Sequence, residues 1–198
     1  MSYWRTYDVK NIMRKELKNM TLAELWELFP IVLTTHNPDW SEWANGEILE
    51  LSALLEDYSP IINHIGSTAI ANIQAKQIID ILVEIAHDND WQRVRETMEE
   101  AGYICMYVSD IRMSFNKGYT PEGYAEKAFH VHFHTVGDND EILFRDYLIG
   151  NPTVAKEYEK LKLSLLPKYK NDRDGYTEAK TEFVRNIVGM AKKVNENL

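Results

Sequence analysis

The sequence is poor in cysteine, and it lacks long apolar runs. Its 198 residues include one cysteine, Cys105, so no disulfide can form within the chain. A reducing compartment, the cytoplasm, is therefore expected. No apolar stretch is long enough to span a membrane, and the basic residues near the N-terminus are not followed by the apolar segment of a signal peptide. We expect no membrane partner.

Positive charge is also scarce. The chain has 22 Lys and Arg against 31 Asp and Glu, a formal net charge of −9. Proteins that bind long nucleic acids need clustered basic residues, so a bulk nucleic-acid partner is not expected. A small anionic ligand needs only a few local donors and is compatible with this charge. The composition carries no information on oligomeric state.

What is present predicts an α/β protein of the α+β kind. A mixed β-sheet in the middle of the chain is expected, with helices packed on one side and a helical C-terminal part. Residues 1–30, with a capping box at Thr21 and Glu24, read as an N-terminal extension packed on a domain of residues 31–198. The expected strands span about 31–34, 61–65, 78–85, 103–109, 111–116 and 129–136, and the expected helices about 21–29, 37–57, 90–101, 141–149, 152–165 and 173–195.

Three further expectations concern side chains and a loop. Cys105 lies in an apolar run and is expected to be a buried core thiol. Residues 117–127 contain Gly118, Pro121 and Gly123 and are typical of a mobile loop. Four of the five tryptophans are expected to pack in the core or between helices; they are Trp26, Trp40, Trp43 and Trp91.

Side chains alternate along a strand, which sorts the residues of 78–85 onto two faces. The face with Ile79, Ile81, Val83 and Ile85 is expected to lie under helices. The other face carries Asp80 and Glu84, whose Cα atoms would lie roughly 13 Å apart. We therefore expect that the two carboxylates do not hold the same ion.

The last strand has the same pattern. His130, His132 and His134 share one face, and imidazoles two residues apart, roughly 6–7 Å, can converge on one metal ion. The alternative is that they form a polar, solvated face. Asp80 offers a complementary partner, which favours a site.

The Gly66-Ser67 turn ends the strand before Asp80. Glycine lets the backbone approach a phosphate, and a serine hydroxyl at a helix start can complete an anion site. Lys76, close to this turn, could neutralise a phosphate or be merely solvated. Arg145 could clamp a phosphate, or it could pair with Asp146 or Asp80 to hold the domain together.

Five groups of residues form a pattern that runs in order along most of the chain, from about residue 38 to residue 187. They are His64 to Ile70, Ala75 to Val83, Phe144 to Leu148, Tyr158 with Leu161 and Lys162, and Tyr176 to Lys180 with Phe183. These segments closely resemble the signature of the GrpB family, and the resemblance implies a nucleotidyltransferase-like fold. Lys180 and Tyr176 match signature positions one turn apart on the last helix, so Lys180 joins the candidate ligand-binding residues.

In the nucleotidyltransferase pattern, Gly-Ser is followed after about ten residues by a strand with two carboxylates. Gly66, Ser67 and Asp80 fit this pattern, but Leu82 stands where the second carboxylate belongs. If His130, His132 or His134 supplies the missing ligands, the resident divalent ion would shift from Mg²⁺ toward Mn²⁺ or Zn²⁺, because imidazole suits softer ions.

The sequence therefore supports a metal-dependent nucleotidyl or phosphoryl transferase that acts on a small molecule. Asp80 and His132 would be catalytic, and Gly66 and Ser67 would hold the phosphate. The first alternative, favoured by Leu82, is a non-catalytic protein of the same fold that binds a nucleotide or an acidic metabolite. A hydrolase with a histidine-bound metal would use the same residues.

Overall fold

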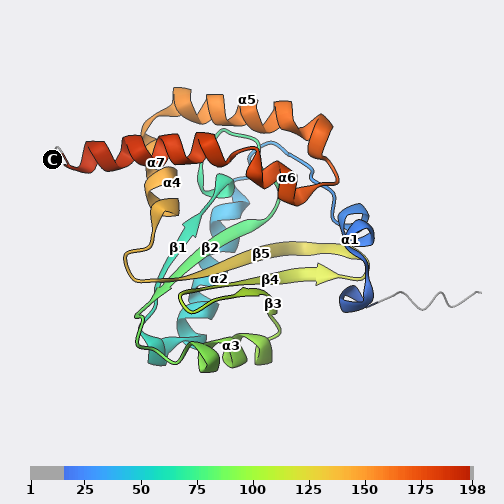
Figure 1. The fold of residues 1–198 in the computed structure, drawn as a ribbon, viewed down its shortest axis with the longest axis vertical. Helices are drawn as coiled ribbons and strands as arrows, with labels where there is room; N and C mark the ends of the chain where they lie inside the picture. The colour runs from blue at the N-terminus through green and yellow to red at the C-terminus, as the bar shows by residue number, and fades with distance from the viewer. Residues whose placement is uncertain (1–15, 197–198) are drawn as a thin grey trace, which may run out of the picture.

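The computed structural model describes residues 16–196. Its central element is a five-stranded sheet in the order β1-β2-β5-β4-β3, in which β2 and β5 run parallel and the other neighbours are antiparallel (Figure 1). The mixed sheet and the α/β class expected from the sequence are confirmed. The strands are β1 (Ile61–Ile65), β2 (Ile79–Ile85), β3 (Ile104–Val108), β4 (Arg112–Thr120) and β5 (Gly123–Thr135).

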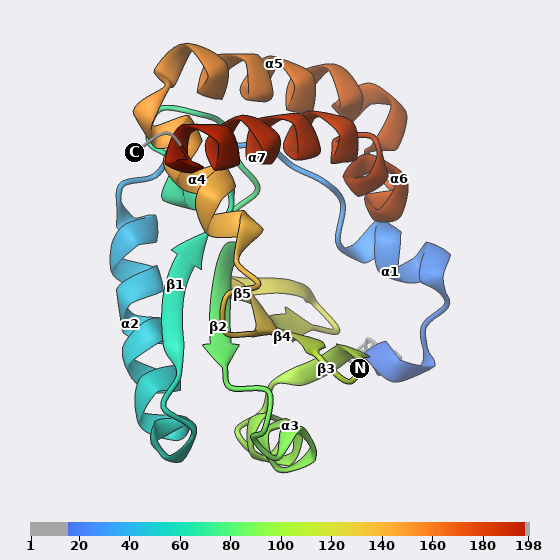
Figure 2. The ribbon, with the colours of Figure 1, turned by 60° about the vertical axis from the view of Figure 1, so that its left-hand side comes forward.

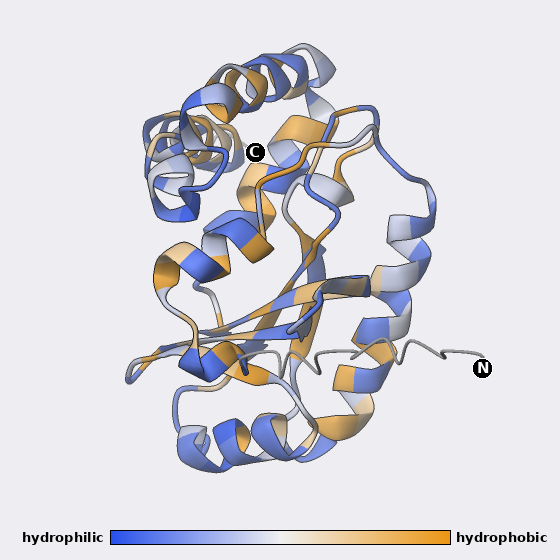
Figure 3. Ribbon diagram, turned by 90° about the vertical axis from the view of Figure 1, so that its right-hand side faces the viewer, coloured by the Kyte–Doolittle hydropathy of each residue, from blue (hydrophilic) through white to orange (hydrophobic). Residues whose placement is uncertain are grey.

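Two helices cover one face of the sheet. α2 (Asp39–Leu54) and α3 (Trp91–Glu100) pack on the side that carries Ile79, Ile81, Val83 and Ile85. Trp40 and Leu51 of α2 and Met98 of α3 are fully buried against it. The face expected to be apolar is therefore the core face, whereas the outer surface of α3 is mainly hydrophilic (Figure 3).

The remaining helices lie toward the other face. α4 (Asp140–Gly150), α5 (Pro152–Tyr169), α6 (Arg173–Glu178) and α7 (Thr181–Glu196) gather at one end of the sheet (Figures 1 and 2). Their second core is formed by Phe144, Leu148, Tyr158 and Ile187 together with Ile70 and Ile73, which follow β1. These contacts hold the C-terminal helices beside the turn that precedes β2.

The N-terminal helix α1 (Leu22–Leu28) stands apart from both cores, next to α6 in Figure 2. Its capping box is formed as expected: the Thr21 side chain accepts from the Glu24 backbone and Glu24 accepts from the Thr21 backbone. The part of the expected N-terminal extension before residue 16 lies outside the described residues, and the boundary at residue 30 stays a prediction.

The expected strand at 31–34 is wrong. Thr34 forms a single bridge with Ala75, and Ile31 donates its amide to the carbonyl of Lys170. The amide of Ile31 bonds to the residue after α5 instead of to a strand, so the chain here crosses between elements as irregular backbone.

The expected loop at 117–127 is also wrong, because these residues extend a β-hairpin. β4 continues to Thr120 and β5 begins at Gly123, so Pro121 sits in the turn. Gly118 has φ +81 at a register shift in β4, and a Cβ atom there would clash with the backbone of Lys127. The glycine marks a β-bulge inside the hairpin rather than a loop.

The apolar run at residues 103–108 is less buried than expected. β3 is one of the two edge strands of the sheet, and Ile104, Met106 and Val108 are exposed. Cys105 is half-buried, and burial raises the pKa of its thiol. Tyr103, just before β3, is the residue of this run that reaches the core.

The expected final helix is divided into two. α6 ends at Glu178 and α7 begins at Thr181, with Ala179 and Lys180 in a turn between them. No described helix is both long enough and apolar enough to cross a membrane.

Candidate metal and anion site

The site begins at the turn that ends β1. Gly66 has φ +71 and ψ −171, a conformation that essentially only glycine adopts. A Cβ atom at this position would clash with the carboxylate of Asp80, which pairs with Ile65 across β1 and β2. Glycine thus allows the backbone to pass directly over Asp80, and Ser67 starts the short 3-10 helix that follows.

The parallel pairing of β2 with β5 decides which histidine meets which carboxylate. Asp80 lies beside His130, Leu82 beside His132, and Glu84 beside His134. Leu82 is completely buried between the two ends of this row. The row therefore divides into a group around Asp80 and a separate pair at the Glu84 end.

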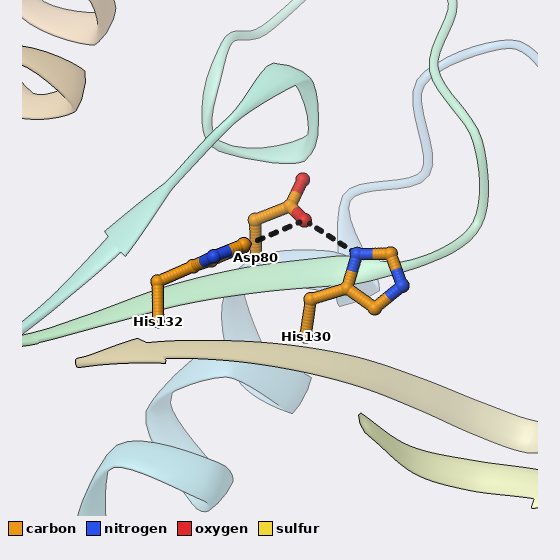
Figure 4. A group of neighbouring side chains, drawn as sticks. All are labelled: Asp80, His130 and His132. Atoms are coloured by element: carbon orange, nitrogen blue, oxygen red, sulfur yellow. Dashed lines mark hydrogen bonds and ion pairs between the residues drawn. The ribbon is translucent and has the colours of Figure 1, made fainter. Parts of the chain in front are cut away.

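Asp80, His130 and His132 point toward one another from β2 and β5 (Figure 4). The Nδ1 atom of His130 lies 3.0 Å from Oδ1 of Asp80, and Nε2 of His132 lies 3.9 Å from the same oxygen. One ligand atom from each residue lies within 4.8 Å of the others, and among the described residues this is the one group of three so arranged. Small side-chain rotations would bring these atoms onto a single ion.

The charges in this group follow from burial and hydrogen bonding. Burial alone would raise the pKa of Asp80, but its interactions with His130 and His132 hold it well below the usual value. Burial lowers the pKa of His130 to about 4 despite the opposing effect of Asp80. At neutral pH Asp80 is therefore a carboxylate and His130 is a neutral imidazole.

A chain of hydrogen bonds orients His130 from its other side. Its Nε2 atom lies 2.6 Å from the hydroxyl of Tyr119, and Nη2 of Arg173 donates to that hydroxyl at 3.0 Å. Arg173 leaves Tyr119 free to donate to Nε2, so that in the metal-free protein Nδ1 of His130 carries the proton donated to Asp80. An ion bound at Nδ1 would require the other tautomer, in which Nε2 carries the proton and donates it to the hydroxyl of Tyr119. Such outer partners fix the orientation of metal-binding imidazoles.

Four cationic side chains line the same pocket as this group: Lys76, Lys162, Arg173 and Lys180. Burial lowers the pKa of Lys76 to about 8, and nearby Arg173 and Lys180 add to the effect. Burial lowers the pKa of Lys162 to about 7, and Lys180 and Lys76 contribute by repulsion. The pKa of Lys180 is also lowered by burial.

Lys162 connects this cationic set to the turn. The side chain is 2 % exposed, and its Nζ atom donates to Oγ of Ser67 at 3.0 Å and to the carbonyl of Gln74. It also lies 4.8 Å from the ring centre of Tyr158. α5 therefore presents an ammonium group directly to the serine that the sequence analysis assigned to phosphate binding.

These residues line one pocket of about 820 Å³. The pocket brings together seven of the predicted site residues: Gly66, Ser67, Lys76, Asp80, His130, His132 and Lys180. Their predicted roles in catalysis, metal binding and phosphate binding stay predictions. Trp26, expected in the core or between helices, lines this pocket.

Two predicted residues lie elsewhere. His134 is buried, with Nδ1 2.8 Å from the carbonyl oxygen of Asp138, so its interactions hold the start of α4. Arg145 donates to the carbonyl of His64 at 2.7 Å and to Asp146, the structural alternative considered for it. The register of β2 and β5 separates His134 from Asp80, and α4 places Arg145 against the backbone of β1 at His64, where it does not line the pocket.

Sequence reasoning missed Arg173, Tyr119 and the role of Lys162. Lys162 lies in a segment that resembles the family signature, which was a usable signal. Tyr119 falls in the stretch expected to be a loop, and Arg173 carries no local pattern. Only the packing of α5 and α6 over the sheet reveals that these three residues lie in the same site as Asp80.

Comparisons with known proteins agree on one family. The profile described as GrpB protein matches residues 30–189. The chain is similar to the glutamate-rich protein GrpB of Alkalihalophilus pseudofirmus, with 37% identity over 80% of this chain and 94% of that protein. A UPF0157 protein of Bacillus subtilis is 30% identical over 87% of this chain, which spans about half, 51%, of that relative.

Solved structures extend the comparison. The crystal structure of GrpB from Enterococcus faecalis aligns with a TM-score of 0.69 at 30% identity, over 83% of this chain and 99% of that one. A poly(U) polymerase aligns with a TM-score of 0.45 at 12% identity, over 75% of this chain and 45% of that one, which is too partial to bear on function. The profile match, the relatives and the shared fold together establish that this chain belongs to the GrpB family.

Proposed function

We propose that the protein is a metal-dependent enzyme that transfers a nucleotidyl or phosphoryl group to a small molecule, with this pocket as its active site. One observation carries the proposal: a three-residue group suited to a divalent ion and four cationic side chains line the same pocket. An ion and cations around a phosphate are the two parts that phosphoryl transfer needs, to hold the group and to neutralise the charge that develops on it.

The cationic set is the argument for a phosphate ligand. Lys180 lowers the pKa of both Lys76 and Lys162, and Lys76 also lowers that of Lys162. The opposing negative charge comes from Asp80, and for Lys162 also from Glu159. A protein with a net charge of −9 has no general excess of basic residues to place there. The repulsion between like charges in a partly buried pocket decreases when an anion binds between them.

The ligand set is the argument for the ion. Asp80 would be its one carboxylate ligand, and His130 and His132 would supply imidazole nitrogens, of which His132 can alternatively accept the proton of the attacking group. Leu82 removes the second carboxylate that Mg²⁺ prefers. We therefore propose Mn²⁺ or Zn²⁺ as the resident ion ahead of Mg²⁺.

We propose a nucleotide or another small phosphorylated molecule as the ligand, not a long nucleic acid, because the basic residues gather in one pocket. A cytoplasmic location goes with the proposal, since nucleotides are available there and the chain has a single thiol.

The test is isothermal titration of Mn²⁺, Zn²⁺ and Mg²⁺ into the wild type, His132→Ala and Asp80→Asn, followed by ATP with and without the metal. Metal affinity should fall at least about 10-fold in both variants, since a ligand is lost. His87→Ala, on the exposed segment after β2, is the control and should behave as the wild type. Equal or tighter binding of Mg²⁺ would contradict the proposed ion.

The second candidate is a metal-independent binding protein, and the single carboxylate beside Leu82 favours it. In that case ATP should bind without metal, and Asp80→Asn should leave the affinity unchanged or increase it by removing a negative charge. Metal-independent binding that survives Asp80→Asn would replace the transferase proposal with this one. Release of phosphate or pyrophosphate from ATP, present with Mn²⁺ and absent in Asp80→Asn, would support transfer chemistry.

A further inference from the structure

The charged group occupies one part of the pocket, and much of the remaining wall is apolar. This wall comes from two elements: α1, together with Met20 before it, and the edge strand β3. The side chains are Met20, Leu22, Leu25, Trp26, Ile104 and Met106.

These side chains are incompletely buried. All residues of α1 are described by the structure, and none of them is fully buried. Leu22 is 55 % exposed and Met106 is 58 % exposed. Figure 3, in which α1 faces the viewer, shows apolar segments on this helix although it lies outside both cores. Apolar surface that adjoins a polar site in one pocket is typical of a ligand site.

The wall is nevertheless anchored. Phe29, directly after α1, is buried with its ring 4.8 Å from the ring of Tyr119 and 5.0 Å from that of Tyr124. Tyr119 is the residue whose hydroxyl meets His130. The helix is thus attached to the hairpin that carries the charged group, and its apolar face stands at a set position relative to that group.

We propose, resting on the function proposed above, that α1 and β3 form a subsite for a bulky apolar group of the ligand. The pocket would then select a phosphorylated molecule that carries an aromatic base or a hydrocarbon chain over inorganic phosphates. Its volume of about 820 Å³ is in the range that holds whole organic ligands. The family profile begins at residue 30, so α1 is an addition of this chain to the region that the profile matches.

The experiment compares three diphosphates by calorimetry in the presence of Mn²⁺: pyrophosphate, ADP and geranyl diphosphate. The wild type should bind ADP or geranyl diphosphate at least about 10-fold more tightly than pyrophosphate, because a buried ring or chain adds apolar contact. Trp26→Ala should remove most of this advantage and change pyrophosphate affinity by less than about 2-fold. A preference for ADP identifies a base, and a preference for geranyl diphosphate identifies a chain.

Leu28→Ala is the matched control, because Leu28 is on the same helix but faces a separate small hollow. It should keep the advantage, and so should Trp26→Phe, which retains an aromatic ring. Unfolding curves establish that the variants are folded. If Trp26→Ala does not fold, Leu22→Asn takes its place in the test.

Two results would overturn the inference. One is equal affinity of the wild type for the three diphosphates, and the other is an equal loss of all three in Trp26→Ala. The wild type would still bind pyrophosphate in both cases, so the proposed function would stand. A wild type that binds none of the three would instead refute the proposed function, and the subsite with it.

Discussion

Lys162 is a buried lysine beside the hydroxyl of Ser67, and we expect its removal to weaken ligand binding while the folded state keeps its stability. Lys162 is held by Ser67 and by the carbonyl of Gln74, and burial lowers its pKa to about 7. In the free protein its charge is therefore lost as the pH rises above neutrality. An anion in the pocket would favour the protonated form again, since opposite charges raise the pKa of an amine.

We expect Lys162→Met to weaken pyrophosphate binding at pH 7 by about 10-fold or more, the worth of a charge-assisted hydrogen bond. The free energy of unfolding of the free protein should change by about 1 kcal/mol or less, because removal of a buried cation offsets the two lost hydrogen bonds. Calorimetry and urea unfolding measure the two effects. Lys160→Met, at an exposed position of α5, should change neither. In the wild type the affinity should fall between pH 7 and pH 9, and a fall of the same size in Lys162→Met would contradict the assignment.

At the scale of elements, two connections position the site, and the first is the turn from β1. Gly66 passes its backbone over Asp80 in a left-handed conformation. The turn therefore couples the fold to the carboxylate: a side chain at this position would displace either the turn or Asp80.

Gly66→Ala should lower the free energy of unfolding by about 2 kcal/mol or more, from backbone strain and the clash with Asp80. Metal affinity should fall with it. Gly46→Ala is the opposite control: Gly46 lies in α2 with no atom within 4 Å of an added Cβ, so alanine should stabilise the protein by about 0.5–1 kcal/mol through helix propensity. Urea unfolding of both variants decides, and a neutral Gly66→Ala would contradict the geometry of the turn.

The second connection joins the hairpin to α2. Nζ of Lys117 in β4 lies 2.9 Å from Oε2 of the buried Glu47 and 2.9 Å from Glu50, and Tyr103 donates to Glu47 at 2.5 Å. These contacts hold the core side of the hairpin two residues before Tyr119, which meets His130.

Lys117→Met should destabilise the protein by about 3 kcal/mol, because Glu47 would keep a buried charge without its cation. Lys127→Met is the matched control: Lys127 is exposed and lies 5.6 Å from the ring of Trp43, an interaction worth about 1 kcal/mol or less. Thermal or urea unfolding measures both. Similar losses of unfolding free energy in Lys117→Met and Lys127→Met would contradict a larger stabilising role for the buried ion pair.

At the scale of the whole molecule, two partly buried histidines make stability depend on pH. Burial lowers the pKa of His64 to about 4, and the same holds for His130. Between pH 4 and about 6.5 the unfolded chain takes up protons on these residues while the folded protein does not. Protons therefore favour unfolding in this window, and the contribution of the two residues to stability is complete above it.

We expect the free energy of unfolding of the metal-free protein to fall as the pH is lowered from about 6.5 toward 4, by up to about 1.4 kcal/mol per pH unit for each histidine. Urea unfolding at pH 7, 6 and 5 measures the slope. His64→Gln should lose about half of it, whereas His87→Gln, at an exposed position, should keep it. Stability that does not change between pH 7 and pH 5 would contradict the burial of both rings.

Local pattern in the sequence determined which residues share a face. Alternation along 78–85 and 129–136 put Asp80 on one strand face and three histidines on another, and the structure has the strands and their core faces as expected. This works because the direction of a side chain on a strand depends on its immediate neighbours alone. The capping box of α1 was readable for the same reason.

Tertiary structure alone decided which members of those faces meet. The register of β2 on β5 puts His130 beside Asp80 and His134 beside Glu84, and the turn between α6 and α7 brings Lys180 to the same pocket as Lys162. Pairing of two parallel strands some fifty residues apart is set by how α2 and α3 pack on their common core, not by any local signal. The candidate ligands could therefore be named from the sequence, but their grouping and the cations around them required the packed molecule.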